Sequence, residues 1–217
     1  MDNLTEKLGD LKALEGPFPS FDLEHLPDHP YPLFAEWFDS VLAYKVKEPH
    51  AMTLSTVDEN GVPDARVLIL KDADEHGWYF ASSSQSRKGK QIQENPAASL
   101  TFYWPVIGRQ VRIRGMVRKM DAERSASDFL ARGKVARATA LAGRQSDLME
   151  TREEIDAALS KQLMELDSDP GLIYPFWTLY RLEANEVEFW QGDEGRKHHR
   201  VRYTSLNNEW LKDLLWP

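Results

Sequence analysis

The chain has 217 residues, 41% of them hydrophobic, so it can bury a core as one large domain or two small ones. The absence of cysteine excludes disulfides, thiolate metal sites and cysteine nucleophiles. A net charge of −8 argues against a general nucleic-acid binder, and no run of 18 apolar residues or signal peptide is seen, so we expect a cytoplasmic protein that binds neither nucleic acid nor membrane.

The first part of the chain differs in character from the rest. Residues 1–30 contain two proline-rich segments that interrupt regular structure, and they are expected to form a partly flexible arm over the surface. Apolar residues at helical spacing then predict an amphipathic helix over 31–46. Residues 31–217 are expected to form the folded domain.

Short strands follow, with helices inserted between them. Strands are predicted at 51–57, 65–71, 77–82, 97–104, 110–119, 176–182, 186–191, 198–204 and 209–215. Helices are predicted after the serine-rich segment 84–86, at 121–132 with Asp121 as cap, at 135–141 and at 151–166. Because these elements do not alternate as βαβ units, the pattern favours an antiparallel β-barrel of the α+β class.

The tract 188–200 combines an aromatic strand end, two glycines and a run of cationic or titratable residues. Trp190 offers a flat apolar surface, and Arg196, His198 and Arg200 would alternate on one side of an extended segment. This pattern indicates a site for a planar, negatively charged ligand. A solvated basic surface is the alternative.

Other basic residues could hold an anion elsewhere in the chain. Arg87 and Lys88 stand where a helix begins, so free backbone N–H groups and two cations would converge on one phosphate seat. Arg66 and Lys71 would lie on opposite faces of a strand and hold different groups. Neither glycine-rich nucleotide-binding loop is present, so side chains and a helix N-terminus would have to hold any phosphate.

These motifs, in this order and spacing, resemble the pyridoxine (pyridoxamine) 5'-phosphate oxidase family over about residues 31–217. The resemblance rests on segments 66–71, 86–88, 109–111, 144–146, 188–192 and 196–200. It implies a split β-barrel homodimer that binds FMN between its subunits. It also implies oxidation of a phosphorylated B6 vitamer to pyridoxal 5'-phosphate, with O2 reduced to H2O2.

The resemblance also implies which residues form the site. The FMN residues would be Arg66, Val67, Lys71, Ala81, Ser82, Arg87, Lys88, Gln110, Gln145, Ser146, Trp190 and Arg200. The substrate residues would be Lys71, Asp128, Arg132, Ala136, Arg196 and His198, with Arg196 and His198 as the catalytic pair over the ring. The cofactor would perform the hydride chemistry while the protein orients the substrate.

Two positions of the substrate phosphate pocket depart from the family's pattern. Asp128 replaces a tyrosine and Ala136 replaces a serine, so two hydroxyl donors are missing. Asp128 stands four residues before Arg132, a helical spacing at which the two would pair. Either affinity for the phosphate falls, or neighbouring Lys134 or Arg137 compensates.

Three classes of function follow. A B6-vitamer phosphate oxidase leads, and a related FMN oxidase of the phenazine-biosynthesis type is the alternative that Asp128 and Ala136 favour. A non-catalytic flavin-binding protein is the third, and the presence of Arg196 and His198 argues against it. No metal site is expected, because the acidic groups lack a histidine pair at ligand spacing.

Overall fold

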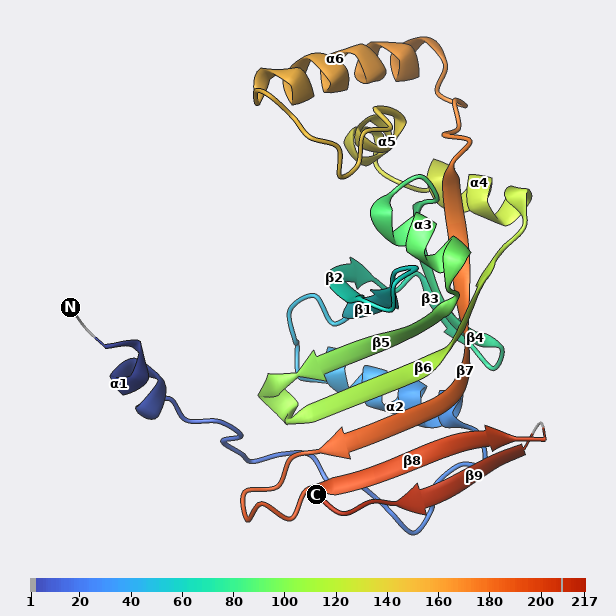
Figure 1. Ribbon diagram of the computed structural model, residues 1–217. Helices are drawn as coiled ribbons and strands as arrows, with labels where there is room; N and C mark the ends of the chain where they lie inside the picture. Colours follow the sequence, from blue (N-terminus) through green and yellow to red (C-terminus); the bar gives the residue numbers. More distant parts are fainter. Residues whose placement is uncertain (1–2, 208) are drawn as a thin grey trace. The chain divides into compact units, whose positions relative to one another are not determined.

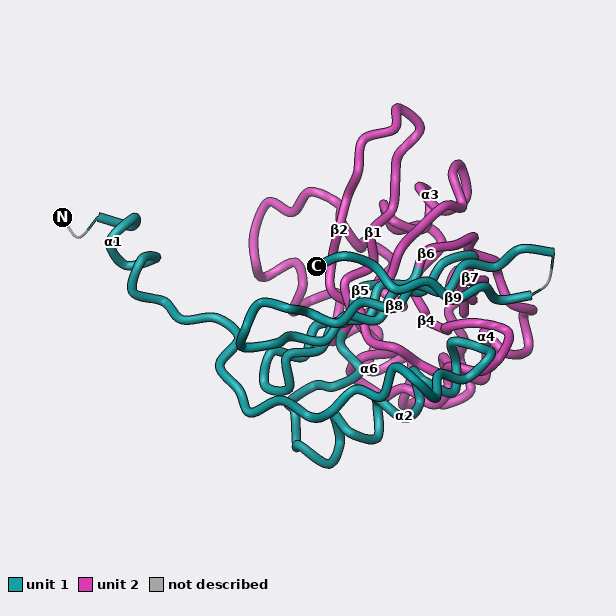
Figure 2. The backbone as a smooth tube through the Cα atoms, turned by 90° about the horizontal axis from the view of Figure 1, so that it is seen from below, with its two compact units in different colours: residues 1–51, 101–113, 185–217 teal, residues 52–100, 114–184 magenta. Residues whose placement is uncertain are grey.

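The computed structural model describes residues 3–207 and 209–217 (Figure 1). The chain forms two compact units (Figure 2). Unit 1 comprises residues 1–51, 101–113 and 185–217, and unit 2 comprises residues 52–100 and 114–184. Each unit is therefore assembled from separate segments of the sequence.

Helices and strands follow one another in the order that the sequence predicts, with two additions and with two of the predicted strands joined into one. The helices are α1 Leu4–Gly9, α2 Pro30–Ala43, α3 Arg87–Glu94, α4 Ala122–Leu130, α5 Lys134–Leu141 and α6 Glu153–Ser168, with a 3-10 turn at Pro105–Ile107. The strands are β1 Ala51–Val57, β2 Pro63–Ile69, β3 Asp72–Asp74, β4 Gly77–Ser83, β5 Ala97–Trp104, β6 Arg109–Lys119, β7 Trp177–Gln191, β8 His199–Leu206 and β9 Glu209–Leu214. Neither α1 nor β3 was expected.

The described strands form one sheet in the order β2-β1-β5-β6-β7-β4-β3, with β8 on β7 and β9 on β8. The pairs β3–β4, β4–β7, β7–β8 and β8–β9 are all antiparallel. Figure 1 shows β8 and β9 side by side as antiparallel neighbours. The sheet and its inserted helices confirm the predicted antiparallel α+β class.

The largest difference from prediction is that β7 is a single strand where two were expected. The polar sequence after Leu182 is typical of a turn, yet the chain stays extended through Glu183. Gly115 on β6 makes this possible, because a Cβ there would lie 1.9 Å from the Glu183 carbonyl oxygen. Arg118 and Arg181 pair with the Glu183 carboxylate and compensate its charge.

The strand expected at 65–71 ends earlier, at Ile69. Lys71 therefore lies in the connection to β3, where its backbone N–H donates to the Tyr79 carbonyl at 2.8 Å. This shift removes Lys71 from the strand on which it was placed opposite Arg66.

Part of the N-terminal arm lies on unit 1. The Arg109 guanidinium donates to the Ser20 carbonyl at 3.1 Å, and the rings of Phe21 and Trp37 meet edge to face at 5.0 Å between centroids. The Tyr203 hydroxyl donates to the Pro27 carbonyl at 3.0 Å. Among the described residues, no helix has the length and apolarity needed to span a membrane.

Candidate cofactor and substrate site

A buried cation marks the N-terminus of α3 in unit 2. Ser86 caps this helix by accepting from the Gly89 N–H at 3.2 Å, as a serine cap was expected to do. The Lys88 ammonium is buried and donates to the hydroxyls of Ser82, at 3.3 Å, and Ser86, at 3.4 Å. It forms no ion pair within residues 3–207 and 209–217. Burial lowers the pKa of Lys88, and repulsion from Arg66 lowers it further.

Two arginines flank Lys88, and the same carboxylate holds both of them. The Oδ2 of Asp64 lies 2.7 Å from a terminal nitrogen of the Arg66 guanidinium and 3.4 Å from the Nε of Arg87. Gln91 supports this arrangement, since its amide donates to Asp64 and its oxygen accepts from Arg66. Three cations and one carboxylate leave a net charge of +2, which suits a phosphate dianion. The donor set therefore fits the phosphate of a nucleotide cofactor.

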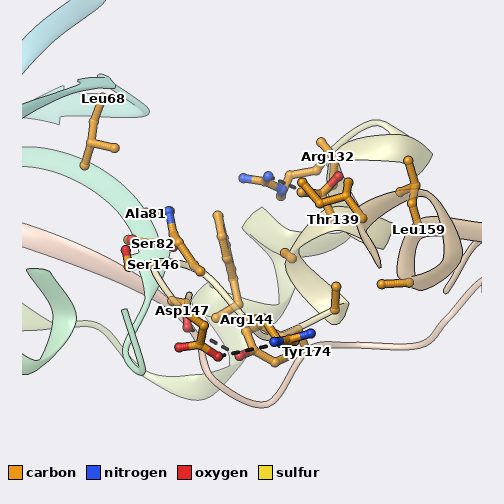
Figure 3. A pocket seen from close by; sticks show the side chains of 18 of the residues that line it. Leu68, Ala81, Ser82, Arg132, Thr139, Arg144, Ser146, Asp147, Leu159 and Tyr174 are labelled. Carbon is orange, nitrogen blue, oxygen red and sulfur yellow. Dashed lines mark hydrogen bonds and ion pairs between the residues drawn. The ribbon is translucent and has the colours of Figure 1, made fainter. Parts of the chain in front are cut away.

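A cavity of about 740 Å³ opens in the same unit (Figure 3). Figure 3 shows Ala81 and Ser82 on one wall and Arg132 beside the helices. The structure brings many of the expected site residues to this one cavity. Its lining includes Lys71, Ala81, Ser82, Arg132, Ala136, Gln145 and Ser146, with Trp177, Tyr174, Ile155 and Leu159 among its apolar members.

The expected pair between Asp128 and Arg132 is wrong. Asp128 instead lies 3.0 Å from the ammonium of Lys71 and accepts from the indole N–H of Trp177 at 2.8 Å. The helical spacing identified a neighbour of Asp128 on its own helix, but the tertiary fold brings Lys71 closer to its oxygens. One of the two expected phosphate-binding cations is therefore already neutralised by the chain.

Arg132 takes a different partner. Its guanidinium lies over the Trp177 ring, 4.0 Å from the centroid, and donates to the Ala136 carbonyl at 3.1 Å. Its Nε is buried and has no partner among the described residues. Burial lowers the pKa of Arg132, and Asp128 partly opposes this effect. Arg132 is thus a cation that lines this pocket and forms no ion pair with the described residues.

Neither suggested substitute for the missing donors is available. Lys134 pairs with Asp167 on α6, and the buried Arg137 donates to the carbonyls of Pro170 and Leu172 at 2.7 and 2.8 Å. Both side chains are engaged in holding α5 to the following segments. Neither residue lines the cavity.

In unit 1, Trp190 and Arg200 are cross-strand neighbours on β7 and β8. The Nε and one terminal nitrogen of Arg200 donate to a single oxygen of Glu188, at 3.0 and 2.9 Å. Its other terminal nitrogen donates to the Trp216 carbonyl at 2.8 Å. Glu188 is only 5% exposed and also pairs with Arg112, so this buried carboxylate fixes the direction of Arg200.

The extended conformation expected for the segment 196–200 is wrong at its first residue. Arg196 has a left-handed backbone, with φ of 63°, because a turn that starts at Asp193 precedes β8. Ser146 is also left-handed, with φ of 78°. Left-handed non-glycine residues are uncommon and are concentrated at functional sites.

The remaining expected residues lie apart from these contacts. Gln110 is half-buried on β6 in unit 1, whereas Val67 on β2 in unit 2 is 67% exposed. Sequence reasoning missed Asp64 and Trp177. No motif spacing links Asp64 to Gln91, 27 residues away, or Trp177 to Asp128, 49 residues away. Within the described part of the chain, no group of three potential metal ligands is found.

Comparison with known proteins identifies the relatives of this chain. Residues 38–164 match the model of the pyridoxamine 5'-phosphate oxidase family. Residues 177–217 match the pyridoxine 5'-phosphate oxidase C-terminal dimerisation region. A pyridoxine/pyridoxamine 5'-phosphate oxidase of Legionella pneumophila is 39% identical over 194 residues, covering 89% of this chain and 90% of the relative. One from Herminiimonas arsenicoxydans is 40% identical over 190 residues, covering 87% and 89%.

Solved structures agree on the fold. PhzG from Burkholderia lata, in complex with tetrahydrophenazine-1-carboxylic acid, has a TM-score of 0.86 and 29% identity over 93% of this chain and all of that one. A pyridoxamine 5'-phosphate oxidase-related, FMN binding protein from Nostoc punctiforme has a TM-score of 0.65 and 21% identity over 90% and 100%. These likenesses confirm the split-barrel fold.

Proposed function

The chain belongs to the pyridoxamine 5'-phosphate oxidase family, and from this we propose that it is a cytoplasmic, homodimeric FMN-dependent oxidase. Its proposed reaction converts a phosphorylated B6 vitamer to pyridoxal 5'-phosphate while O2 is reduced to H2O2. The observation that carries this proposal is the cavity to which Lys71 and Arg132 contribute together with Ser82 and Ser146. The proposed FMN-binding domain is residues 31–217, with residues 1–30 as the arm.

FMN is the cofactor of the family, and the seat at α3 fits its phosphate. Arg66, Arg87 and Lys88 would hold that phosphate, since together with Asp64 they leave a net positive charge at the N-terminus of α3. Ala81, Ser82, Gln145 and Ser146 would contact the rest of the cofactor. The family resemblance also assigns Gln110, Trp190 and Arg200 to the cofactor, and these three residues lie in unit 1. Bound FMN supplies the two-electron acceptor that the side chains lack.

The chain's own residues bind and orient the substrate. Arg132, with Lys71, would bind the substrate's anionic group, and Arg196 and His198 would donate hydrogen bonds to its ring. Such positioning contributes to catalysis because it aligns the carbon to be oxidised before the reaction starts. The match of residues 177–217 to a dimerisation region supports the proposed homodimer.

The direct test measures H2O2 release by the FMN-loaded protein. We expect release with pyridoxamine or pyridoxine 5'-phosphate and much less with the dephosphorylated vitamers, because these lack the anion that Arg132 would bind. A protein that takes up no FMN, or that releases no H2O2 with either phosphate ester, would contradict the proposal.

The Lys71–Asp128 pair favours a second candidate, an oxidase of a planar ring that carries a carboxylate. Lys71, Asp128 and Arg132 together carry a net charge of +1, which a carboxylate neutralises and a phosphate dianion exceeds. PhzG, with which this chain shares 29% identity, was solved with a ring carboxylic acid of this kind. Faster H2O2 release with tetrahydrophenazine-1-carboxylic acid than with the B6 phosphates would favour this candidate.

A further inference from the structure

Asp193 contacts the backbone or side chain of three consecutive residues in the turn before β8. Its backbone N–H donates to the Nδ1 of His198 at 3.1 Å, and its carbonyl accepts from the Arg196 N–H at 3.0 Å. Its carboxylate accepts from the Lys197 N–H at 3.0 Å. The preceding residue is anchored as well, since the Gly192 N–H donates to the Gly108 carbonyl at 2.7 Å. The hydrogen bonds of Asp193 therefore fix the conformation of the turn, and Asp193 itself follows a residue that is bonded to Gly108.

The bond to His198 fixes which of its nitrogens carries the proton. A backbone N–H can only donate, so the Nδ1 that receives it has no proton. The proton of the neutral ring is then on Nε2. Among the described residues, Nε2 has no hydrogen-bond partner, so it is left to donate to a ligand.

We propose that Asp193 is a positioning residue for the substrate-binding pair Arg196 and His198. Asp193 holds His198 in the Nε2–H tautomer and, through the bonds to the Arg196 and Lys197 N–H groups, holds Arg196 in its left-handed conformation. This inference rests on the proposed function for the identity of the pair, but the tautomer itself is a property of the protein alone.

Neighbouring groups restrict His198 further. The Trp190 ring lies 4.9 Å from the imidazole, centroid to centroid, at an interplanar angle of 45°. The Arg196 side chain is exposed and forms no ion pair in the described part of the chain. Both members of the pair are therefore available to a ligand and both present N–H donors.

A chemical restriction follows from the tautomer. Two donors recognise a ring edge that carries lone pairs or negative charge, such as a ring oxygen or nitrogen. The neutral imidazole cannot accept a proton at Nε2, because that position already carries one. A proton that leaves the substrate during oxidation must then pass to a group other than Nε2 of His198.

The test uses nuclear magnetic resonance on the full-length, FMN-loaded protein labelled with ¹⁵N-histidine, at mildly alkaline pH where histidines are mostly neutral. The His198 signals are assigned by their loss in His198→Gln. We expect an unprotonated Nδ1 and a protonated Nε2 without any substrate present. A protonated Nδ1 in the wild-type protein would overturn the proposal.

Three variants separate positioning from a general structural role. Asp193→Pro removes the amide donor, so we expect His198 to become a mixture of tautomers. Asp193→Asn keeps both the amide and a side-chain acceptor and should match the wild type. Asp193→Ala keeps the amide but releases Lys197, so we expect an unchanged tautomer with KM raised at least fivefold and kcat altered less. An unchanged spectrum in Asp193→Pro, or an unchanged KM in Asp193→Ala, would overturn the inference.

The result is distinguishable from a failure of the proposed function. If no B6 phosphate is oxidised, the proposed function fails while the wild-type tautomer can still be read from the spectrum. If Asp193→Pro does not fold, Asp193→Ala and the wild-type spectrum still decide the inference.

Discussion

The Asp128 carboxylate lies 3.0 Å from the ammonium of Lys71, and Lys71 lines the cavity. Asp128→Asn removes the negative charge and frees Lys71 to bind an anion. We expect affinity of the FMN-loaded protein for pyridoxal 5'-phosphate to increase five- to tenfold, equivalent to about 1 kcal/mol for a partly buried pair. Calorimetric titration measures this affinity. The affinity for unphosphorylated pyridoxal should not change.

A matched control is available on α6. Asp167→Asn breaks an ion pair to Lys134, a residue that does not line the cavity. Asp167→Asn should leave the affinities for pyridoxal 5'-phosphate and for pyridoxal unchanged. Equal effects of Asp128→Asn and Asp167→Asn would show that the gain is a general charge effect and not a property of the pocket.

Lys88 offers a test of the phosphate seat. Lys88→Met removes a buried ammonium whose partners among the described residues are the hydroxyls of Ser82 and Ser86. We expect FMN binding to weaken by about 1.5 to 3 kcal/mol, or ten- to a hundredfold. Quenching of flavin fluorescence measures the affinity. Riboflavin, which lacks the phosphate, should bind both proteins alike. Lys90 on the same helix is exposed, so Lys90→Met is the control. An equal loss of FMN affinity in Lys90→Met would contradict the assignment of Lys88 to the FMN phosphate.

The lowered pKa of Lys88 predicts a pH dependence with a definite sign. The ordinary value is 10.5, and burial followed by repulsion from Arg66 lowers it. The phosphate needs the charged ammonium, so FMN affinity should begin to fall, as pH rises, below the pH at which an ordinary lysine deprotonates. Titrations across the alkaline range measure this fall. Lys88→Arg keeps its charge to higher pH, and an identical pH profile for that variant would refute the assignment.

Gly115 is expected to be essential for the continuous strand β7. In Gly115→Ala the new Cβ would meet the Glu183 carbonyl oxygen at 1.9 Å, and the backbone must shift. We expect the free energy of unfolding to fall by about 3 kcal/mol. Urea denaturation followed by tryptophan fluorescence measures the change. Gly133→Ala is the control, because a Cβ at Gly133 meets nothing within 4 Å, and a similar loss there would contradict the close approach.

Local signals in the sequence predicted most of the elements. The strands at 51–57 and 97–104 have the predicted bounds. The cap of α3 is a serine, Ser86, as expected of the segment 84–86, and Asp121 is the predicted cap of α4. These features depend on residues within a few positions of one another. The continuity of β7 was missed because it depends on Gly115, which is distant in sequence and reveals its role only when the strands pair.

The same limit applies to the site. The family resemblance assigned Lys71 and Arg132 to the substrate and Ser146 to FMN, and the structure shows all three lining one cavity. Helical spacing gave Arg132 as the partner of Asp128, yet Lys71 and Trp177 take that carboxylate. Such contacts join segments that the sequence separates, and no periodic pattern encodes them.

The division of the chain has a consequence for how this protein can be recombined with its relatives. Residues 52–100 and 114–184 carry the α3 seat and the cavity, whereas 185–217 carry the turn at Asp193. The boundary near residue 184 falls inside a strand, β7, so a splice there keeps the register only if the exchanged piece has the same length. We expect a chimaera that takes residues 114–184 from a relative to show that relative's choice of substrate anion and to keep the His198 tautomer of this chain.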